Sequence, residues 1–124
     1  MPAAAQAREA KFEAEGYAPS EEMGPPALID GCTFAGNPGS ALLVEGSRAV
    51  LRNSVFLDNG GPTVEFGGAI SVVPLCTSGY CRPSNLEVSA CDLVNNTAEK
   101  GGALFVRRGI ADIDASTFQR NRAT

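Results

Sequence analysis

One short phrase recurs along this chain, and its recurrence limits the folds that the chain can adopt. An aromatic or aliphatic residue stands three positions before an asparagine, and successive copies begin 22, 37 and 25 residues apart. The four pairs are Phe34 and Asn37, Phe56 and Asn59, Leu93 and Asn96, and Phe118 and Asn121. Repeats at periods of roughly 20–50 residues are typical of architectures that stack one structural unit on the next.

Each copy is flanked by sequence that is typical of strands. Apolar residues recur five positions before the first residue of the motif, and polar or mixed residues follow them. A glycine-containing break after the asparagine leads into a second segment with the same alternation, as in Gly67 to Val72. Alternation with a period of two predicts a strand with one buried face. One repeat unit is therefore a strand, an asparagine turn, a glycine break and a second strand.

Stacked parallel strands explain these repeats better than hairpins do. In a parallel stack, equivalent residues lie over one another about 4.8 Å apart. Asparagine side chains in such a column can donate and accept hydrogen bonds from one coil to the next. We therefore expect an all-β fold, a right-handed parallel β-helix of about three to four coils, with Phe34, Phe56, Leu93 and Phe118 in its interior. An antiparallel sandwich stays open as an alternative, because Asn59-Gly60 is a hairpin signal.

The two ends and one insertion interrupt the repeat. Residues 1–26 contain many helix formers and end in a Gly-Pro-Pro break, so we expect an N-terminal arm, helical or disordered, that is a candidate cap. Residues 27–124 are expected to hold the coils, with an insertion at 74–85. The last coil is open, and exposed strand edges are normally covered. We expect truncation there, or a protein partner or further β-helix coils on that edge.

The four cysteines are of two kinds. Cys32 and Cys91 share one column of the repeat and would lie two coils apart, too far for a disulfide, which needs Cα atoms within about 7 Å. We expect both to be unpaired and to pack in or near the wall. Cys76 and Cys81 both fall in the insertion and are a candidate disulfide, favoured in a secreted protein and disfavoured in the cytosol.

Composition excludes several functions. The chain has a formal net charge of −4, which argues against nucleic-acid binding. It has no histidine, which removes Ser-His, Cys-His and His-metal chemistry. No window approaches the roughly 18 apolar residues of a transmembrane helix, and the first residues lack a secretory signal. We expect no catalytic residue, no metal and no cofactor.

Two surface features have candidate roles. Asp112 and Asp114 point to the same side of one strand, without a third carboxylate in the adjacent coil. We assign them to a solvated strand face. Asn95 begins an Asn-Asn-Thr sequon and is a candidate glycosylation site.

The motifs also carry a family resemblance. Phe56-x-x-Asn59 with Gly67-Gly68-Ala69-Ile70, and Phe118-x-x-Asn121 with Gly101-Gly102-Ala103-Leu104, resemble the FxxN and GGA[ILV] repeats of the polymorphic outer-membrane protein family. The resemblance covers about residues 27–124. It implies the passenger region of a bacterial surface protein, a right-handed parallel β-helix of the pectate-lyase-like type that is used in adhesion. It also implies an extracellular or cell-surface location.

Three functions follow as expectations. The first is a non-enzymatic β-helix module, structural or adhesive, from a larger surface-type protein. The second is a fragment of a carbohydrate-active enzyme, for which a carbohydrate would be the ligand. The third is an accessory subunit that docks on a larger assembly through its open coil.

Overall fold

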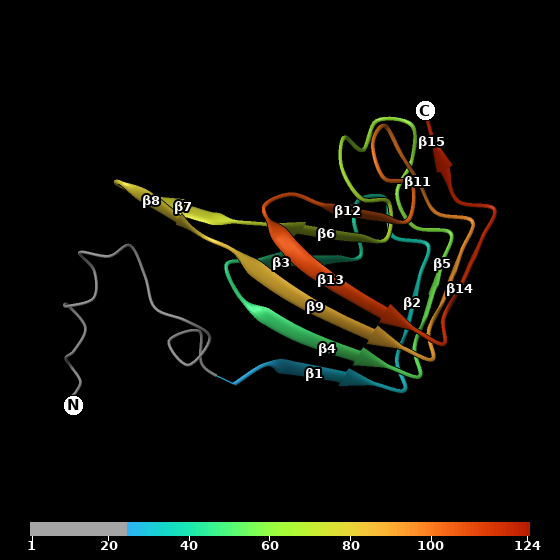
Figure 1. The fold of residues 1–124 in the computed structure, drawn as a ribbon. Helices are drawn as coiled ribbons and strands as arrows, with labels where there is room; N and C mark the ends of the chain where they lie inside the picture. The colour runs from blue at the N-terminus through green and yellow to red at the C-terminus, as the bar shows by residue number, and fades with distance from the viewer. Residues whose placement is uncertain (1–24) are drawn as a thin grey trace.

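The computed structural model describes residues 25–124, and this part of the chain consists of strands and turns without a helix (Figure 1). The predicted all-β class is therefore confirmed. The predicted N-terminal arm, residues 1–26, lies outside the described residues except for Pro25 and Pro26, which are exposed.

The strands are short, as expected for segments that turn a corner every few residues. The first eight are β1 (Ala27–Asp30), β2 (Thr33–Ala35), β3 (Leu42–Glu45), β4 (Arg48–Arg52), β5 (Val55–Leu57), β6 (Ile70–Val73), β7 (Leu75–Thr77) and β8 (Tyr80–Arg82). The others are β9 (Ser84–Ser89), β10 (Asp92–Val94), β11 (Thr97–Ala98), β12 (Leu104–Val106), β13 (Gly109–Asp114), β14 (Thr117–Gln119) and β15 (Arg122–Ala123).

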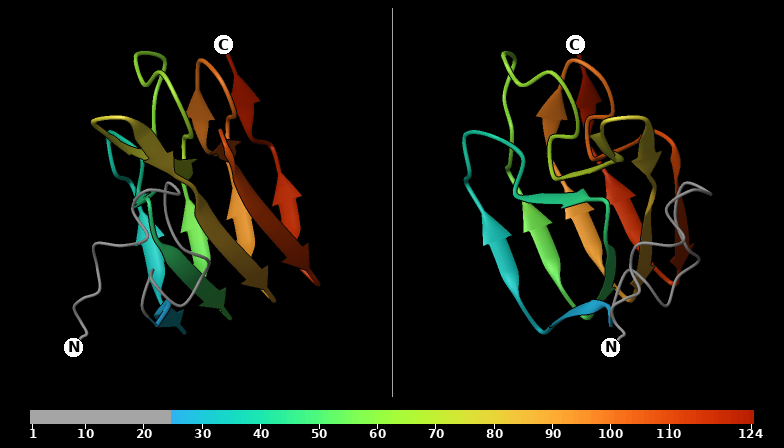
Figure 2. Two further views of the ribbon diagram at one scale, coloured as in Figure 1. Left: turned by 60° about the vertical axis from the view of Figure 1, so that its left-hand side comes forward. Right: turned by 90° about the vertical axis from the view of Figure 1, so that its left-hand side faces the viewer.

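Three parallel sheets contain most of these strands. The first sheet has the order β1-β4-β9-β13, the second β14-β10-β5-β2 and the third β12-β6-β3. Figure 2 shows the four strands of the second sheet side by side. The chain passes from the third sheet to the first and then to the second, and it repeats this passage. We call one passage a circuit, so neighbouring strands in a sheet belong to successive circuits.

Pairing within the three sheets is parallel throughout, so the prediction of parallel strands is confirmed. The alternative of an antiparallel sandwich is wrong for these sheets, because Asn59-Gly60 does not close a hairpin. Gly60 instead forms an isolated parallel bridge with Thr97 of the following circuit. The antiparallel pair among the described strands is β7 with β8, which lies outside the three sheets.

The register of the pairing matches the alignment of the repeats. In the second sheet Phe34 pairs with Phe56, Phe56 with Leu93, and Leu93 with Phe118. In the third sheet Leu42 and Leu104 both pair with Ile70. Equivalent residues of the sequence motif are therefore neighbours in space.

The core lies between the three sheets and is formed by the side chains that alternate inward. The buried apolar residues come from all three sheets: Val44, Ala49, Leu51, Phe56, Ala69, Ile70, Val72, Leu86, Val88, Cys91, Leu93 and Ala103. The rings of Phe34 and Phe56 stack with centroids 4.6 Å apart and an interplanar angle of 5°. Offset or parallel stacking of this kind adds to the energy of burial.

Two corners of each circuit are made by a single residue in the left-handed backbone region. The corner between the first and second sheets is formed by Gly31, Asn53, Ala90 and Ala115 in successive circuits, and the corner after the second sheet by Gly36, Asp58, Asn95 and Arg120. Their φ angles lie between 50° and 69°. This conformation is unfavourable for L-residues other than glycine. Several residue types nevertheless adopt it here, because the flanking strands fix the geometry of the corner.

The insertion forms a hairpin of β7 and β8 that projects from the body where the third sheet leads into the first (Figure 1). In the preceding and following circuits, the same connection is a tight corner, formed at Gly46 and Arg108. The hairpin lies between these two corners. Gly46 on one side has so little room that an added Cβ would lie 2.4 Å from Cβ of Leu75. On the other side, Arg108 contacts Cys81. The neighbouring corners therefore support the base of the hairpin.

The strands at the two edges of the sheets are more exposed than those inside. Phe118 of β14 is 41% exposed and Phe34 of β2 is half-buried, whereas Phe56 and Leu93 are fully buried. The expectation that all four residues lie in the interior is therefore wrong for Phe118. The reason is physical: β14 pairs only with β10 among the described strands, so Phe118 has no neighbour on its far side.

Candidate functional site

The four motif asparagines form a hydrogen-bonded column beside the second sheet. The Oδ1 of Asn59 accepts the backbone N–H and the Nδ2–H of Asn37, at 3.1 and 2.8 Å. Asn96 accepts the same two donors from Asn59, and Asn121 accepts them from Asn96. All three links therefore have the same geometry and direction.

The same amides also bond backward, to the carbonyl of the motif's first residue in the preceding circuit. Nδ2 of Asn59 donates to the Phe34 carbonyl at 3.0 Å, and Nδ2 of Asn96 donates to the Phe56 carbonyl at 3.1 Å. Nδ2 of Asn121 donates to the carbonyl of Leu93. Asn59 and Asn96 are buried. Because each buried amide has its donors and acceptor engaged, the column is a structural element rather than a reactive one.

A second column contains cysteine and serine in alternation. Cys32 and Cys91 are both unpaired thiols; Cys91 is buried, but Cys32 is exposed. The expectation that both pack in or near the wall is therefore wrong for Cys32, which belongs to the edge circuit. The hydroxyls of Ser54 and Ser116 accept the backbone N–H groups of Cys32 and Cys91, at 3.2 and 3.1 Å. The serines thus join successive circuits at the corner between the first and second sheets.

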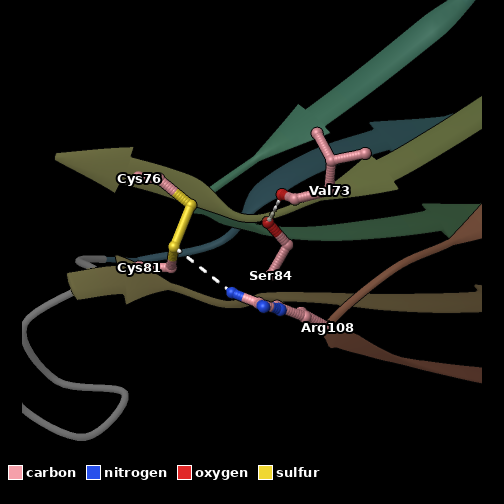
Figure 3. Close-up of a disulfide and its surroundings, with 5 residues drawn as sticks. All are labelled: Val73, Cys76, Cys81, Ser84 and Arg108. Carbon is pink, nitrogen blue, oxygen red and sulfur yellow. Dashed lines mark hydrogen bonds between the residues drawn. A yellow bond between two sulfur atoms is a disulfide. The ribbon is translucent and has the colours of Figure 1, made fainter.

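The hairpin carries a disulfide. Cys76 and Cys81 are bonded and face one another across β7 and β8 (Figure 3). An Nη1 of Arg108 lies 3.5 Å from Sγ of Cys81. At the base, the hydroxyl of Ser84 donates to the Val73 carbonyl at 2.7 Å. The hairpin is therefore closed by a covalent bond and held at its base by a buried serine.

The sequon residue lies at an exposed corner. Asn95 has a φ of 60° and its Nδ2 donates to Oδ1 of Asp58, the equivalent corner residue of the preceding circuit. Attachment of a glycan would replace one of the two hydrogens on this nitrogen, and the remaining N–H could still donate to Asp58.

The outer face of the first sheet carries acidic residues around a shallow hollow. The hollow is lined by Val50, Arg52, Glu87, Val88, Ser89, Asp112, Ile113 and Asp114. Strand pairing places Glu87 of β9 directly opposite Asp112 of β13. The expectation that the adjacent coil provides no third carboxylate is therefore wrong. Across residues 25–124, however, no three acidic or sulfur side chains converge closely enough to hold a metal ion.

A cluster of aromatic and cationic side chains lies where the third sheet begins and ends. The rings of Phe66 and Phe105 are 4.4 Å apart, with an interplanar angle of 31°. Nζ of Lys100 lies 5.6 Å from the centre of the Phe66 ring, and the Arg107 guanidinium lies 5.8 Å from it. We call Phe66, Lys100, Phe105, Arg107 and Arg108 the cationic–aromatic patch.

Sequence reasoning missed the cationic–aromatic patch, although one signal was available. Phe66 and Lys100 each stand directly before the glycine pair of their repeat, and they form a parallel bridge in the structure. The alignment of the repeats therefore implied that they are neighbours. Phe105 and Arg107 had no such marker, because they face outward from positions that vary between circuits.

Among residues 25–124 there is no helix with the length and apolar character that a bilayer crossing requires. No protein-family model, no curated protein and no solved structure matches this chain.

Proposed function

We propose that this chain is a right-handed parallel β-helix module that is not an enzyme and that serves a structural or binding role. The observation that carries the proposal is the repeated circuit, with equivalent residues in register in three sheets and an asparagine column at one corner. Connections between parallel strands of one sheet are right-handed in about 98% of cases. Stacked circuits produce long, flat, solvated faces, which suit binding.

The same observations support a relationship to the polymorphic outer-membrane protein repeats and a surface-type, adhesive role. The FxxN positions lie at the stacked corner, and the GGA positions lie where neighbouring circuits approach closely. At Gly68, an added Cβ would be 2.0 Å from the carbonyl oxygen of Gly102. The disulfide between Cys76 and Cys81 supports an extracellular location, because disulfides persist in oxidising compartments.

A carbohydrate-active enzyme fragment is the second candidate, favoured by the acidic hollow of the first sheet. Hydrolysis of a glycosidic bond needs two carboxyl groups with different protonation roles, about 5 to 9.5 Å apart. Glu87, Asp112 and Asp114 supply the carboxyl groups, but all three lie on an outer wall shared with Arg52 and Ser89. Exposed carboxylates that face one another on a flat wall are well solvated. They are less suited to a site in which one carboxyl acts as the acid and the other as the base or nucleophile.

An accessory subunit is the third candidate, favoured by the exposed edge. Ile113 and Phe118 are 43% and 41% exposed, and their strands pair on one side only among the described strands. Further coils or a protein partner would bury both side chains and pair the free backbone groups.

The experiment that separates these functions is a binding screen paired with a depolymerisation assay. The purified chain is applied to arrays of glycans and of extracellular proteins, and every bound polysaccharide is then incubated with it and assayed for new reducing ends or unsaturated products. Binding without cleavage supports the proposal. Cleavage that is lost in Asp112→Asn would establish the enzyme instead. A chain that binds no array member but forms a stable complex through its Phe118 edge would establish the accessory subunit.

A further inference from the structure

The cationic–aromatic patch has a fixed geometry. Lys100 and Arg107 both lie over the ring of Phe66, which itself packs against Phe105. Attraction between a cation and an aromatic face restricts where each cationic group sits. Arg108 is held separately, by its contact with Cys81 of the hairpin. Three flexible side chains are therefore positioned before any ligand arrives, which lowers the entropic cost of binding.

Within residues 25–124, the charges of the patch have no carboxylate partner. Lys100, Arg107 and Arg108 are exposed, and none forms an ion pair with a carboxylate of residues 25–124. This contrasts with the composition of the chain, which has 14 acidic and 10 basic residues. Lys100 and Arg107 share the Phe66 ring, and Arg107 and Arg108 line one hollow, so the three cations form a local positive site for an anionic group in an acidic protein.

The hairpin turns part of the patch into a hollow. Pro74 and Cys76, at the start of the hairpin, line this hollow together with Arg107 and Arg108. Figure 3 shows the guanidinium of Arg108 directed at the disulfide, which braces the hairpin beside it. A planar guanidinium at such a position can bind a carboxylate or sulfate through two parallel hydrogen bonds.

From this geometry we propose that the cationic–aromatic patch binds an anionic glycan, with carboxylate or sulfate groups on Lys100, Arg107 and Arg108 and a sugar ring against Phe66 and Phe105. The inference rests on the proposed binding function and names its ligand class. A glycan fits better than an acidic peptide because apolar and aromatic surface adjoins the charges, as in sites that combine a few polar groups with an apolar lining. A nucleic acid fits poorly because the rest of the chain is acidic.

The test is isothermal titration calorimetry with a heparin-derived hexasaccharide. The neutral sugar maltohexaose and the peptide hexaglutamate are titrated in parallel. We expect the hexasaccharide to bind, with an affinity that falls as salt rises, and the other two probes to bind at least about tenfold more weakly. Loss of charge-assisted hydrogen bonds in the double variant Arg107→Gln, Arg108→Gln should raise Kd at least about tenfold.

The matched control is Arg52→Gln with Arg120→Gln, which removes the same charge from two exposed sites outside the patch, one at the end of β4 and one just after β14. Its Kd should change less than about twofold, since screened distant charges contribute little. Equal losses in both double variants would overturn the patch as the site. Hexaglutamate binding as tightly as the hexasaccharide would overturn the glycan assignment, and maltohexaose binding as tightly would overturn the role of charge.

The variant Phe66→Leu separates a glycan site from a purely electrostatic one. It keeps every charge and removes the aromatic face, so we expect a Kd increase of about threefold or more together with unchanged salt dependence. An unchanged Kd would overturn the role assigned to the aromatic pair. A wild-type chain that binds none of the probes would overturn this inference alone, because the proposed function is decided by the array and cleavage assays.

Discussion

Internal and edge strands contain the same motif but bury it very differently. Leu93 in β10 and Phe118 in β14 are paired neighbours in the same column, yet Leu93 is 0% exposed and Phe118 is 41% exposed. Val88 and Ile113, paired in the first sheet, are 3% and 43% exposed. The larger side chain is the more exposed one in both pairs, so residue type does not decide burial here.

This difference teaches that each circuit is buried by the circuits on both sides of it. In repeat architectures the stability is approximately a sum of intrinsic terms and contacts between nearest neighbours. A substitution in a column should therefore cost more in an internal strand than in an edge strand, even where the residue is equivalent. The following substitutions test that rule in paired positions.

The largest difference is expected between Leu93→Ala and Phe118→Ala. Removal of a fully buried leucine leaves a cavity and should lower the free energy of unfolding by about 3 to 5 kcal/mol. Phe118→Ala removes a side chain that is only partly buried, so it should lower the free energy of unfolding by about 1 kcal/mol. Urea denaturation with unchanged slopes measures both. Equal losses would mean that the edge is covered in solution.

The next difference concerns glycines at which neighbouring backbones approach. A Cβ at Gly68 would lie 2.0 Å from the Gly102 carbonyl oxygen and 2.6 Å from the Thr97 nitrogen, whereas a Cβ at Gly39 would have no atom within 4 Å. Gly68→Ala should therefore cost about 3 kcal/mol through forced backbone shifts, and Gly39→Ala at most about 0.5 kcal/mol. Thermal melting of the two variants compares them. A mild effect at Gly68 would show that the circuits can separate at little cost.

The asparagine column should show a smaller but similar gradient. Asn59→Ala removes the acceptor of Asn37 and takes the side-chain donor away from the Asn96 and Phe34 oxygens, although Asn96 keeps the backbone N–H of residue 59. We expect a loss of about 1 to 3 kcal/mol. Asn121→Ala affects one neighbouring circuit only and should cost about 1 kcal/mol. Arg52→Ala on the exposed wall should cost at most about 0.5 kcal/mol. Denaturation midpoints that fall equally for Asn59→Ala and Arg52→Ala would refute the buried column.

The smallest expected effect is at the corners, and it should be equal in an internal circuit and an edge circuit. Such a result would limit the rule of greater internal cost to the strands. Ala90 and Ala115 are equivalent corner residues with φ angles of 54° and 50°. Glycine relieves the left-handed strain but gains freedom when unfolded, so each Ala→Gly should stabilise the protein by about 0.5 kcal/mol. The strain is local and both corners are exposed. A gain confined to Ala90 would show that stacking also controls the corners.

The strands and their register could be predicted from the sequence because the alternation and the motif spacing are local and repeated. The pairing of Phe34 with Phe56 follows from the spacing, and so does the asparagine column. Strand alternation identifies the inward face, and this explains why Leu51 and Val88 belong to the core.

The corners and the degree of burial could not be predicted in the same way. One corner is formed by Gly31, Asn53, Ala90 and Ala115, and only the first two are residue types that favour a positive φ. The strands around a corner impose its geometry, so the single residue carries little signal. The exposure of Phe118 depends on the number of neighbouring strands, which the residue itself does not encode.

The asparagine column also gives the stack an electrical polarity. The amide oxygens of Asn59, Asn96 and Asn121 receive hydrogen bonds from the preceding circuit. The matching donors are the amide nitrogens of Asn37, Asn59 and Asn96, so the side-chain dipoles align. Aligned hydrogen bonds polarise one another in a medium of low dielectric constant. An aspartate at position 59 would still accept from Asn37 but would face the Asn96 oxygen with a second acceptor. An acidic side chain inside the column would therefore replace one hydrogen bond to the following circuit with a repulsive contact between two oxygens.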